Sequence, residues 1–325
     1  METSLNFWTI DTKNYPRIGA IHRYNEAFDA LVGRDAVIEV LAGGFYWTEG
    51  PIWIRDGGYL LFSDIPRNAT MKWKEGEGVS VYLQPSGYTG PGSYGKEPGA
   101  NGMTLDAEGQ LVSCEHGDRR MSVLTKGGGK RTLTDNYQGR RFNSPNDCVF
   151  KSNGDLYFTD PAYGLPNQFE DTRREMDYCG VFRYGRDGVT TLLTKELSRP
   201  NGLAFSVDEK TLYVGNSDPE RAVWMAYELL ADGTLGAGKV FYDVTSAVGK
   251  LPGLPDGFKL DVNGNIFATG PGGVYVFNPA GELLGRMETG EATANCAWGD
   301  DGSSLYVCSD MYLVRIRTQT RGKLL

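Results

Sequence analysis

A strand–turn–strand pattern occurs six times along the chain. Each copy opens with a short polar residue, usually followed by glycine and an apolar run; a tight turn such as "SNGD" or "DVNGN" then leads to a second apolar run such as "LYF". The copies start 39 to 55 residues apart, at Glu49, Asn101, Asn146, Asn201, Asp256 and Asn295. Two more strand-like segments follow most copies, so each unit predicts a four-stranded antiparallel sheet. Six such sheets arranged radially make an all-β, six-bladed β-propeller.

The sixth copy is one strand short. The chain runs out soon after "MYLVRIRT", while a strand-like segment, "AVIEVLA" at 36–42, precedes the first copy and belongs to no repeat. We therefore expect residues 36–42 to complete the last blade and close the ring. This predicts one propeller domain over 36–325, with residues 1–35 as an N-terminal extension that packs on it.

The charge and the ends of the chain limit its partners and location. Lys and Arg total 33 against 41 Asp and Glu, a net charge of −8, with no basic block. This disfavours binding to nucleic acid or to anionic membranes. No apolar run reaches the roughly 18 residues of a membrane span, and "METSLNFWTI" lacks the features of a signal peptide. A cytoplasmic protein, as a monomer or small homo-oligomer, is expected, and the five cysteines without a C-x-x-C motif are predicted to be buried thiols.

Only two histidines, His22 and His116, are present. This count excludes a three-histidine zinc site and leaves a Ser/His/Asp triad little choice of histidine. The G-x-S-x-G, G-x-G-x-x-G and phosphate-loop motifs are also missing. Any chemistry must therefore depend mainly on side-chain oxygens, and His22, outside the repeats, is given no role.

The six motif residues share one predicted position. Each stands just before the innermost strand of its blade, and innermost strands line the central channel, so all six should surround one mouth of it. The tips of the second strands should reach the same rim, at His116, Asp160, Tyr163 and Asp218. Asn and Asp before a strand also cap turns locally, which is the alternative for any one of them. Two carboxylates, Glu49 and Asp256, would repel across the channel unless a cation lay between them, and oxygen donors suit Ca²⁺, Mg²⁺ or Mn²⁺.

At these residues the chain resembles the senescence-marker-protein/gluconolactonase/luciferin-regenerating family, and most closely its bacterial gluconolactonases. The resemblance rests on "TEGPIW", "CEHGDRR", "NSPND", "RPNGLAFSVDEKTLYV" and "LPDGFKLDVNGNIF", and covers about residues 41 to 316. It implies a six-bladed propeller with one divalent cation in the channel, Ca²⁺ first and Mg²⁺, Mn²⁺ or Zn²⁺ as alternatives. It also implies that Glu49, Asn201 and Asp256 bind the metal, with Asn146 as a further ligand or a substrate-orienting residue.

The resemblance further implies hydrolysis of a sugar lactone such as gluconolactone. The cation would polarise the carbonyl while Asp256 activates water as the general base, or attacks directly as a nucleophile, with Glu49 as a structural ligand. The residues predicted to contact the substrate are Asn101, His116, Ser144, Asp160 and Tyr163. Ser144 stands where some animal members have an arginine that grips the lactone, and the segment "SGYTGPGSYGKEPGANG" is long enough to shape a different mouth.

Two other functions are compatible with the sequence. The same site could hydrolyse non-sugar lactones or phosphotriesters, because a phosphoryl oxygen can replace the carbonyl oxygen on a cation. A propeller can also be a non-enzymatic binding scaffold. The presence of Glu49, Asn146, Asn201 and Asp256 together argues against a scaffold, which has no need of four axial oxygens.

Overall fold

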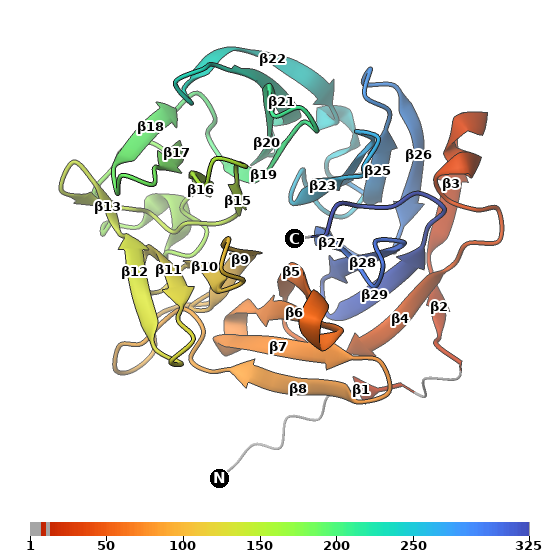
Figure 1. Cartoon of the computed structure of the whole chain (residues 1–325), viewed down its shortest axis with the longest axis horizontal. Coiled ribbons are helices and arrows are strands. Elements are labelled where there is room, and N and C mark those ends of the chain that lie inside the picture. The colour runs from red at the N-terminus through yellow and green to blue at the C-terminus, as the bar shows by residue number, and fades with distance from the viewer. Residues whose placement is uncertain (1–7, 11–13, 325) are drawn as a thin grey trace.

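Six antiparallel sheets surround a central axis, as the repeats predict (Figure 1). The computed structural model describes residues 8–10 and 14–324. Within these residues the regular structure is strand, with five short 3-10 helices and no α-helix. The helices are η1 (Glu26–Ala30), η2 (Arg55–Gly57), η3 (Ile65–Arg67), η4 (Gln168–Glu170) and η5 (Thr245–Ala247). The prediction of an all-β, six-bladed propeller is confirmed.

The first three blades each run outward from the axis in chain order. Blade 1 is β5 (Thr48–Ile54), β6 (Tyr59–Asp64), β7 (Ala69–Lys74) and β8 (Gly78–Leu83). Blade 2 is β9 (Ala100–Leu105), β10 (Leu111–Glu115), β11 (Arg120–Leu124) and β12 (Lys130–Thr134). Blade 3 is β15 (Cys148–Phe150), β16 (Leu156–Asp160), β17 (Gly180–Tyr184) and β18 (Thr190–Thr194). A two-stranded ribbon, β13 (Asn136–Tyr137) and β14 (Arg140–Arg141), lies between blades 2 and 3 in the chain.

The other three blades complete the circle. Blade 4 is β19 (Pro200–Phe205), β20 (Thr211–Asp218), β21 (Arg221–Leu229) and β22 (Leu235–Asp243). Blade 5 is β23 (Phe258–Leu260), β24 (Ile266–Gly270), β25 (Gly273–Phe277) and β26 (Leu283–Glu288). Blade 6 is β27 (Thr293–Gly299), β28 (Ser304–Ser309), β29 (Tyr312–Arg317) and β4 (Ile38–Gly43).

The strand from the start of the chain closes the ring, as predicted. β4 is antiparallel to β29, with Ile38 opposite Ile316 and Ala42 opposite Leu313. Arg315 of β29 is buried and bonds to Glu39 of β4 at 2.9 Å and to Glu75 of blade 1 at 2.6 Å, so it ties the closing strand to the next blade. Pairing between a strand from the start of the chain and one from its end covers the edge of β29 that would otherwise be exposed.

Three further short strands come from the predicted N-terminal extension. β1 (Trp8–Thr9) and β2 (Arg17–Ile18) pair with β4, and β3 (Ala20–Arg23) adds a fifth strand to blade 5. Phe28 of η1 is fully buried in the apolar cluster between blades 5 and 6. Residues 1–7 and 11–13 of the extension lie outside the described residues.

The core lies between neighbouring blades. Alternating strand residues point to opposite faces of each sheet, and the apolar faces of adjacent blades pack together. Between blades 1 and 6, for example, Trp73 and Phe62 are buried with Tyr306. All five cysteines are buried and free, which confirms the prediction of buried thiols. No helix of the described chain is long and apolar enough to cross a membrane.

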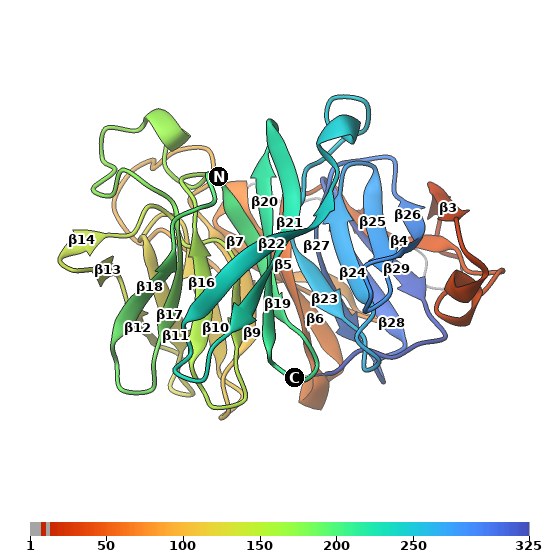
Figure 2. The same cartoon turned by 90° about the horizontal axis from the view of Figure 1, so that it is seen from above.

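The two ends of the propeller differ (Figure 2). The loops after β16 and after β22 project from one end, while the C-terminal end of the chain lies at the other. There, Val262 donates its backbone N–H to Arg321, and the Thr320 hydroxyl donates to the Asp261 carboxylate at 2.7 Å. The C-terminal segment is thus fixed to blade 5 at the end opposite the long loops.

Candidate functional site

A cavity of about 520 Å³ opens at the end of the axis where the long loops lie. Five of the six motif residues line it, each from a different blade: Glu49, Asn101, Asn146, Asn201 and Asp256. Apolar side chains such as Trp47, Leu251 and Leu254 form part of its wall. A groove of similar volume between blades 2 and 3 contains none of the motif residues. A largely apolar cavity with a few convergent polar groups is the usual form of a small-molecule site.

The glycines that follow the motif residues explain how the inner strands approach each other so closely. A Cβ on Gly202 would lie 2.3 Å from the carbonyl oxygen of Asp256, and a Cβ on Gly257 would lie 1.9 Å from Cγ of Asn295. Gly50 has the same relation to the Asn101 carbonyl in the next blade. Each glycine therefore packs against the motif residue of the following blade. The sequence needs "NG" or "DG" here for packing as well as for turns.

Beneath the cavity lies a polar layer that sequence analysis did not single out. Asp147 stands where four other repeats have glycine, and its carboxylate is buried at the axis. Asn295 donates from Nδ2 to Glu49 Oε2 at 3.1 Å and to Asp147 Oδ2 at 3.3 Å. Lys259 Nζ lies 3.4 Å from Asn295 Oδ1. The sixth motif residue thus supports the carboxylates from below and does not line the cavity.

The axial carboxylates are electrostatically unfavourable as a group. Burial, and then the charge of Asp147, raises the pKa of Glu49, while burial followed by the charge of Glu49 raises the pKa of Asp256. Burial also raises the pKa of Asp147. Lys259 is the cation that opposes these shifts at Glu49 and Asp147. Three carboxylates against one lysine leave two negative charges in excess when all are ionised, which favours a bound cation.

Several buried oxygens facing this region have no hydrogen-bond partner. They are Oδ1 of Asn101, Oδ1 of Asn146 and Oδ1 of Asp256. Leaving a buried acceptor unpaired costs roughly 1–3 kcal/mol, so each marks a place for a ligand atom. Among the described residues, no group of three or more His, Cys, Asp or Glu side chains is arranged to hold a metal ion. A cation here would therefore depend on asparagine oxygens as well as on carboxylates, a donor set suited to hard ions.

His116 lies behind Asn101 and outside the cavity lining. It is fully buried, and its Nε2 is 3.2 Å from Nδ2 of Asn101, which makes the amide the donor and the ring nitrogen the acceptor. Its Nδ1 lies 3.6 Å from Oε2 of Glu97, which itself lines the cavity. Burial lowers the pKa of His116 to about 4 and raises that of Glu97 to about 7. His116 thus holds the Asn101 amide with its oxygen free, and the histidine, expected to contact substrate, lies behind the cavity wall.

Tyr163 and Asn201 meet at Ser217 on the cavity wall. The Tyr163 hydroxyl is 2.9 Å from Ser217 Oγ, and Asn201 Nδ2 donates to the same oxygen at 3.2 Å. Burial raises the pKa of Tyr163 to about 12, so the phenol stays protonated at neutral pH. Tyr163 therefore lines the cavity as expected, with Ser217 as a partner that sequence analysis did not name.

Ser144 and Asp160, expected to contact substrate, lie outside the cavity lining. Both are fully buried. Asp160 accepts the backbone N–H groups of Asn143 and Ser144 at 2.8 Å each, and Ser144 Oγ donates to the Pro161 carbonyl at 2.6 Å. Their polar atoms hold the loops after β14 and β16 together. Asp218, expected at the rim, bonds to Ser198 and is also outside the lining.

The family comparison covers most of the propeller. The model described as SMP-30/gluconolactonase/LRE-like region matches residues 47–310, which include every motif residue. The chain belongs to this family. Within it, a gluconolactonase of Zymomonas mobilis is 42% identical over 321 residues, covering 95% of this chain and 89% of that protein.

Solved structures share the propeller fold. A gluconolactonase of Xanthomonas campestris has a TM-score of 0.80 and 30% identity, covering 93% of this chain and 97% of that one. A regucalcin of Agrobacterium tumefaciens, described as a calcium-binding protein, has a TM-score of 0.69 over 86% of this chain and 92% of that one. Its identity is 18%, so that likeness bears on the fold alone.

Proposed function

We propose that this protein is a lactonase that opens a sugar lactone such as gluconolactone with the help of one divalent cation. The observation that carries the proposal is the axial cavity, in which two carboxylates and two amides from four blades line one space: Glu49, Asn146, Asn201 and Asp256. The 42% identity to a protein named gluconolactonase, over nearly the full length of both chains, supports the choice of substrate.

Those four residues would hold the cation, with Ca²⁺ as the first candidate and Mg²⁺, Mn²⁺ or Zn²⁺ as alternatives. The excess negative charge at the axis and the unpartnered oxygens of Asn146 and Asp256 fit such an ion. When bound, it supplies a Lewis acid for the lactone carbonyl oxygen. Asn295 and Lys259 would keep the supporting layer in place from below.

The chain's own groups then handle water and protons. Asp256, ionised beside the cation, accepts a proton from the water that attacks the carbonyl carbon. The ring C–O bond breaks, and the same proton passes to the departing ring oxygen, which gives the hydroxy acid. Asn101, held by His116 with Oδ1 free, accepts a hydrogen bond from a substrate hydroxyl. Trp47, Leu251 and Leu254 limit the access of bulk water.

A pH-stat assay tests this proposal. The protein is stripped of metal, and hydrolysis of aldonolactones, aliphatic lactones and a phosphotriester is followed while Ca²⁺, Mg²⁺, Mn²⁺ and Zn²⁺ are restored one at a time. We expect the aldonolactones to be the best substrates and activity to return with a cation. Asp56→Asn, in the exposed turn at the opposite end of β5 from Glu49, is the control for carboxylate loss. Full activity in the stripped protein, or none on any lactone with every cation, would contradict the proposal.

A further inference from the structure

A second pocket, of about 480 Å³, lies beside blade 2 and outside the axial cavity. We call it the arginine pocket, after three of its lining residues, Arg119, Arg141 and Arg173. Tyr88 and Tyr94 of the long segment before β9 also line it. Their rings are 4.8 Å apart, and the Arg173 guanidinium lies 5.4 Å from the Tyr94 ring centre. None of its lining residues belongs to the axial cavity.

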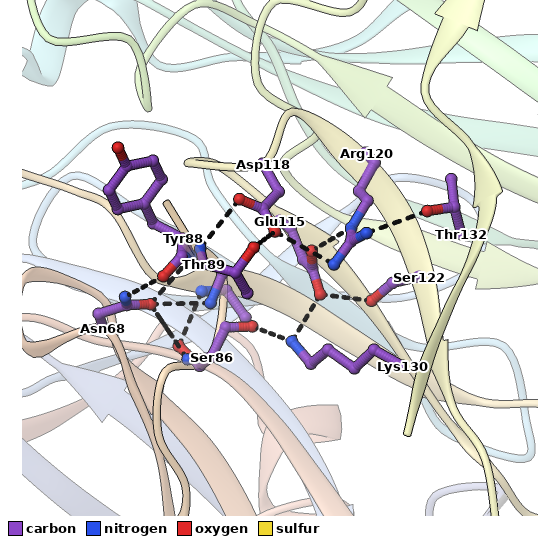
Figure 3. A network of polar contacts seen from close by, with 12 residues as sticks. Asn68, Ser86, Tyr88, Thr89, Glu115, Asp118, Arg120, Ser122, Lys130 and Thr132 are labelled. Carbon is purple, nitrogen blue, oxygen red and sulfur yellow. Dashed lines mark hydrogen bonds and ion pairs between the residues drawn. The ribbon is translucent and has the colours of Figure 1, made fainter. Parts of the chain in front are cut away.

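A polar network adjoins the arginine pocket and includes its lining residues Thr89, Asp118 and Arg120 (Figure 3). Glu115 is fully buried and pairs with Arg120 Nε at 2.6 Å and with Lys130 Nζ at 2.5 Å. Asp118 accepts the backbone N–H and the hydroxyl of Thr89 at 3.0 and 2.7 Å and lies 3.1 Å from Arg120 Nη2. These acids are therefore already engaged, and they hold the long segment against blade 2.

Arg119 has an unfavourable backbone conformation and a buried, incompletely paired side chain in this pocket. Its backbone is left-handed, with φ of 54°, and its side chain is nearly fully buried. Nε donates to the carbonyls of Phe142 and Asn143 at 2.7 and 3.1 Å, and Nη1 donates to the Arg173 carbonyl at 3.2 Å. Nη2 is buried and has no partner. A buried, charged donor without an acceptor is unfavourable by itself and marks the place of a missing acceptor.

Arg141 adds a second guanidinium that is poorly neutralised. Its side chain is exposed, its Nη2 donates to the Asp118 carbonyl at 2.8 Å, and its backbone N–H donates to the Glu175 carboxylate at 2.8 Å. Its guanidinium forms no ion pair with the described residues. Glu175 is 4.0 Å from Arg119 and half exposed, and Asp135 at the rim bonds to Asn136. Burial, and then the charge of Arg141, lowers the pKa of Arg119. Arg173, by contrast, is already paired with Asp171.

We propose that the arginine pocket binds a small oxyanion, the phosphate or carboxylate group of a small molecule, between the side chains of Arg119 and Arg141. Guanidinium groups present parallel N–H donors that match the oxygens of both anions. Tyr88 and Tyr94 offer ring surface for the rest of the ligand. The pocket is separate from the axial site, so this proposal stands whether or not the lactonase proposal holds.

Calorimetric titration tests the proposal and distinguishes the two anions. The intact protein is titrated at neutral pH and near-physiological salt with inorganic phosphate, with gluconate as the carboxylate probe, and with the uncharged polyol glucitol. We expect phosphate or gluconate to bind and glucitol not to bind. Arg141→Gln should weaken that binding on the order of tenfold or more, because one charge-assisted contact is removed. Arg141→Lys keeps the charge without the planar group, so its affinity for the anion should lie between that of the wild type and that of Arg141→Gln.

Arg140→Gln is the matched control, since Arg140 is exposed like Arg141 and lies on the same ribbon but does not line the pocket. Thermal unfolding of each variant shows whether the fold is kept. Phosphate binding that Arg141→Gln weakens identifies a phosphate site, and gluconate binding with the same response identifies a carboxylate site. Binding of neither anion, or binding that Arg141→Gln and Arg140→Gln affect equally, would overturn the proposal.

Discussion

Acidification should destabilise the fold through His116. This side chain is fully buried, and burial lowers its pKa to about 4, whereas an unfolded chain has a histidine pKa of about 6.5. Below pH 6.5 the unfolded chain therefore binds a proton that the folded protein does not, and stability is lost as the pH falls toward 4. One pKa unit corresponds to about 1.4 kcal/mol, so His116 alone should lower the free energy of unfolding by about 2 kcal/mol between pH 7 and pH 5.

Urea unfolding of the wild type and of His116→Gln at pH 7 and pH 5 measures this effect. The variant lacks the titrating group, so the change in its free energy of unfolding between the two pH values should be smaller by about 2 kcal/mol. Glu97, 3.6 Å from His116 Nδ1, is present in both proteins, and its own titration largely cancels in the comparison. His22→Gln is the control, because His22 is partly exposed and bonds to Glu288. Equal pH dependence in wild type and His116→Gln would refute the reasoning.

Four other substitutions probe the axis and the ring. At saturating cation, Asp256→Asn should still lose on the order of 10²–10⁴ in kcat, as expected for loss of a general base. Glu49→Gln should instead recover part of its activity as cation is added. Measuring kcat of both variants across a metal titration tests these expectations. Gly257→Ala should cost about 1–3 kcal/mol in urea unfolding, because its Cβ would overlap Asn295. Arg315→Gln should cost about 2 kcal/mol in the same assay, since it leaves the partly buried partners of the ring closure unpaired.

Matched controls separate these effects from general damage. Gly127→Ala should be nearly neutral, because its nearest neighbour would be 3.9 Å from the new Cβ. Arg34→Gln removes a surface ion pair with Asp29 and should change stability by less than about 1 kcal/mol. Wild-type turnover of cation-saturated Asp256→Asn would make Asp256 a ligand only. Normal stability of Gly257→Ala or Arg315→Gln would mean that neighbouring blades tolerate more rearrangement than their packing suggests.

The fold could be predicted because its signal is periodic. Six copies of one pattern, a missing last strand and a spare early strand determine both the number of blades and the closure by β4. The cavity-lining motif residues follow from the same logic, since residues where the inner strands begin lie near the axis. The prediction placed all of them before these strands, whereas Glu49, Asn101 and Asn201 are the second residues of β5, β9 and β19. Their roles in binding metal and substrate remain predictions.

The rest of the site could not be read from the repeat. Ser144 and Asp160 are polar and close to the motif, but unpaired backbone groups in the adjoining loops use their polar atoms first. Lys259 and Glu97 look like ordinary strand and loop residues, and only the packed structure brings them to the axis. Asp147 could have been found from the sequence, because it replaces the glycine that follows the motif residue in four other repeats.

The closure of the ring has a consequence for biosynthesis. β4 is made within the first 43 residues, yet its partner β29 spans Tyr312–Arg317, almost at the end of the chain. While the ribosome extends the chain, the edge of β4 that pairs with β29 in the finished blade has no native partner. Unpaired apolar edges of this kind promote aggregation. The ring can therefore close only after β29 has been synthesised. Truncation before Tyr312 should yield insoluble protein even though five complete blades are already encoded.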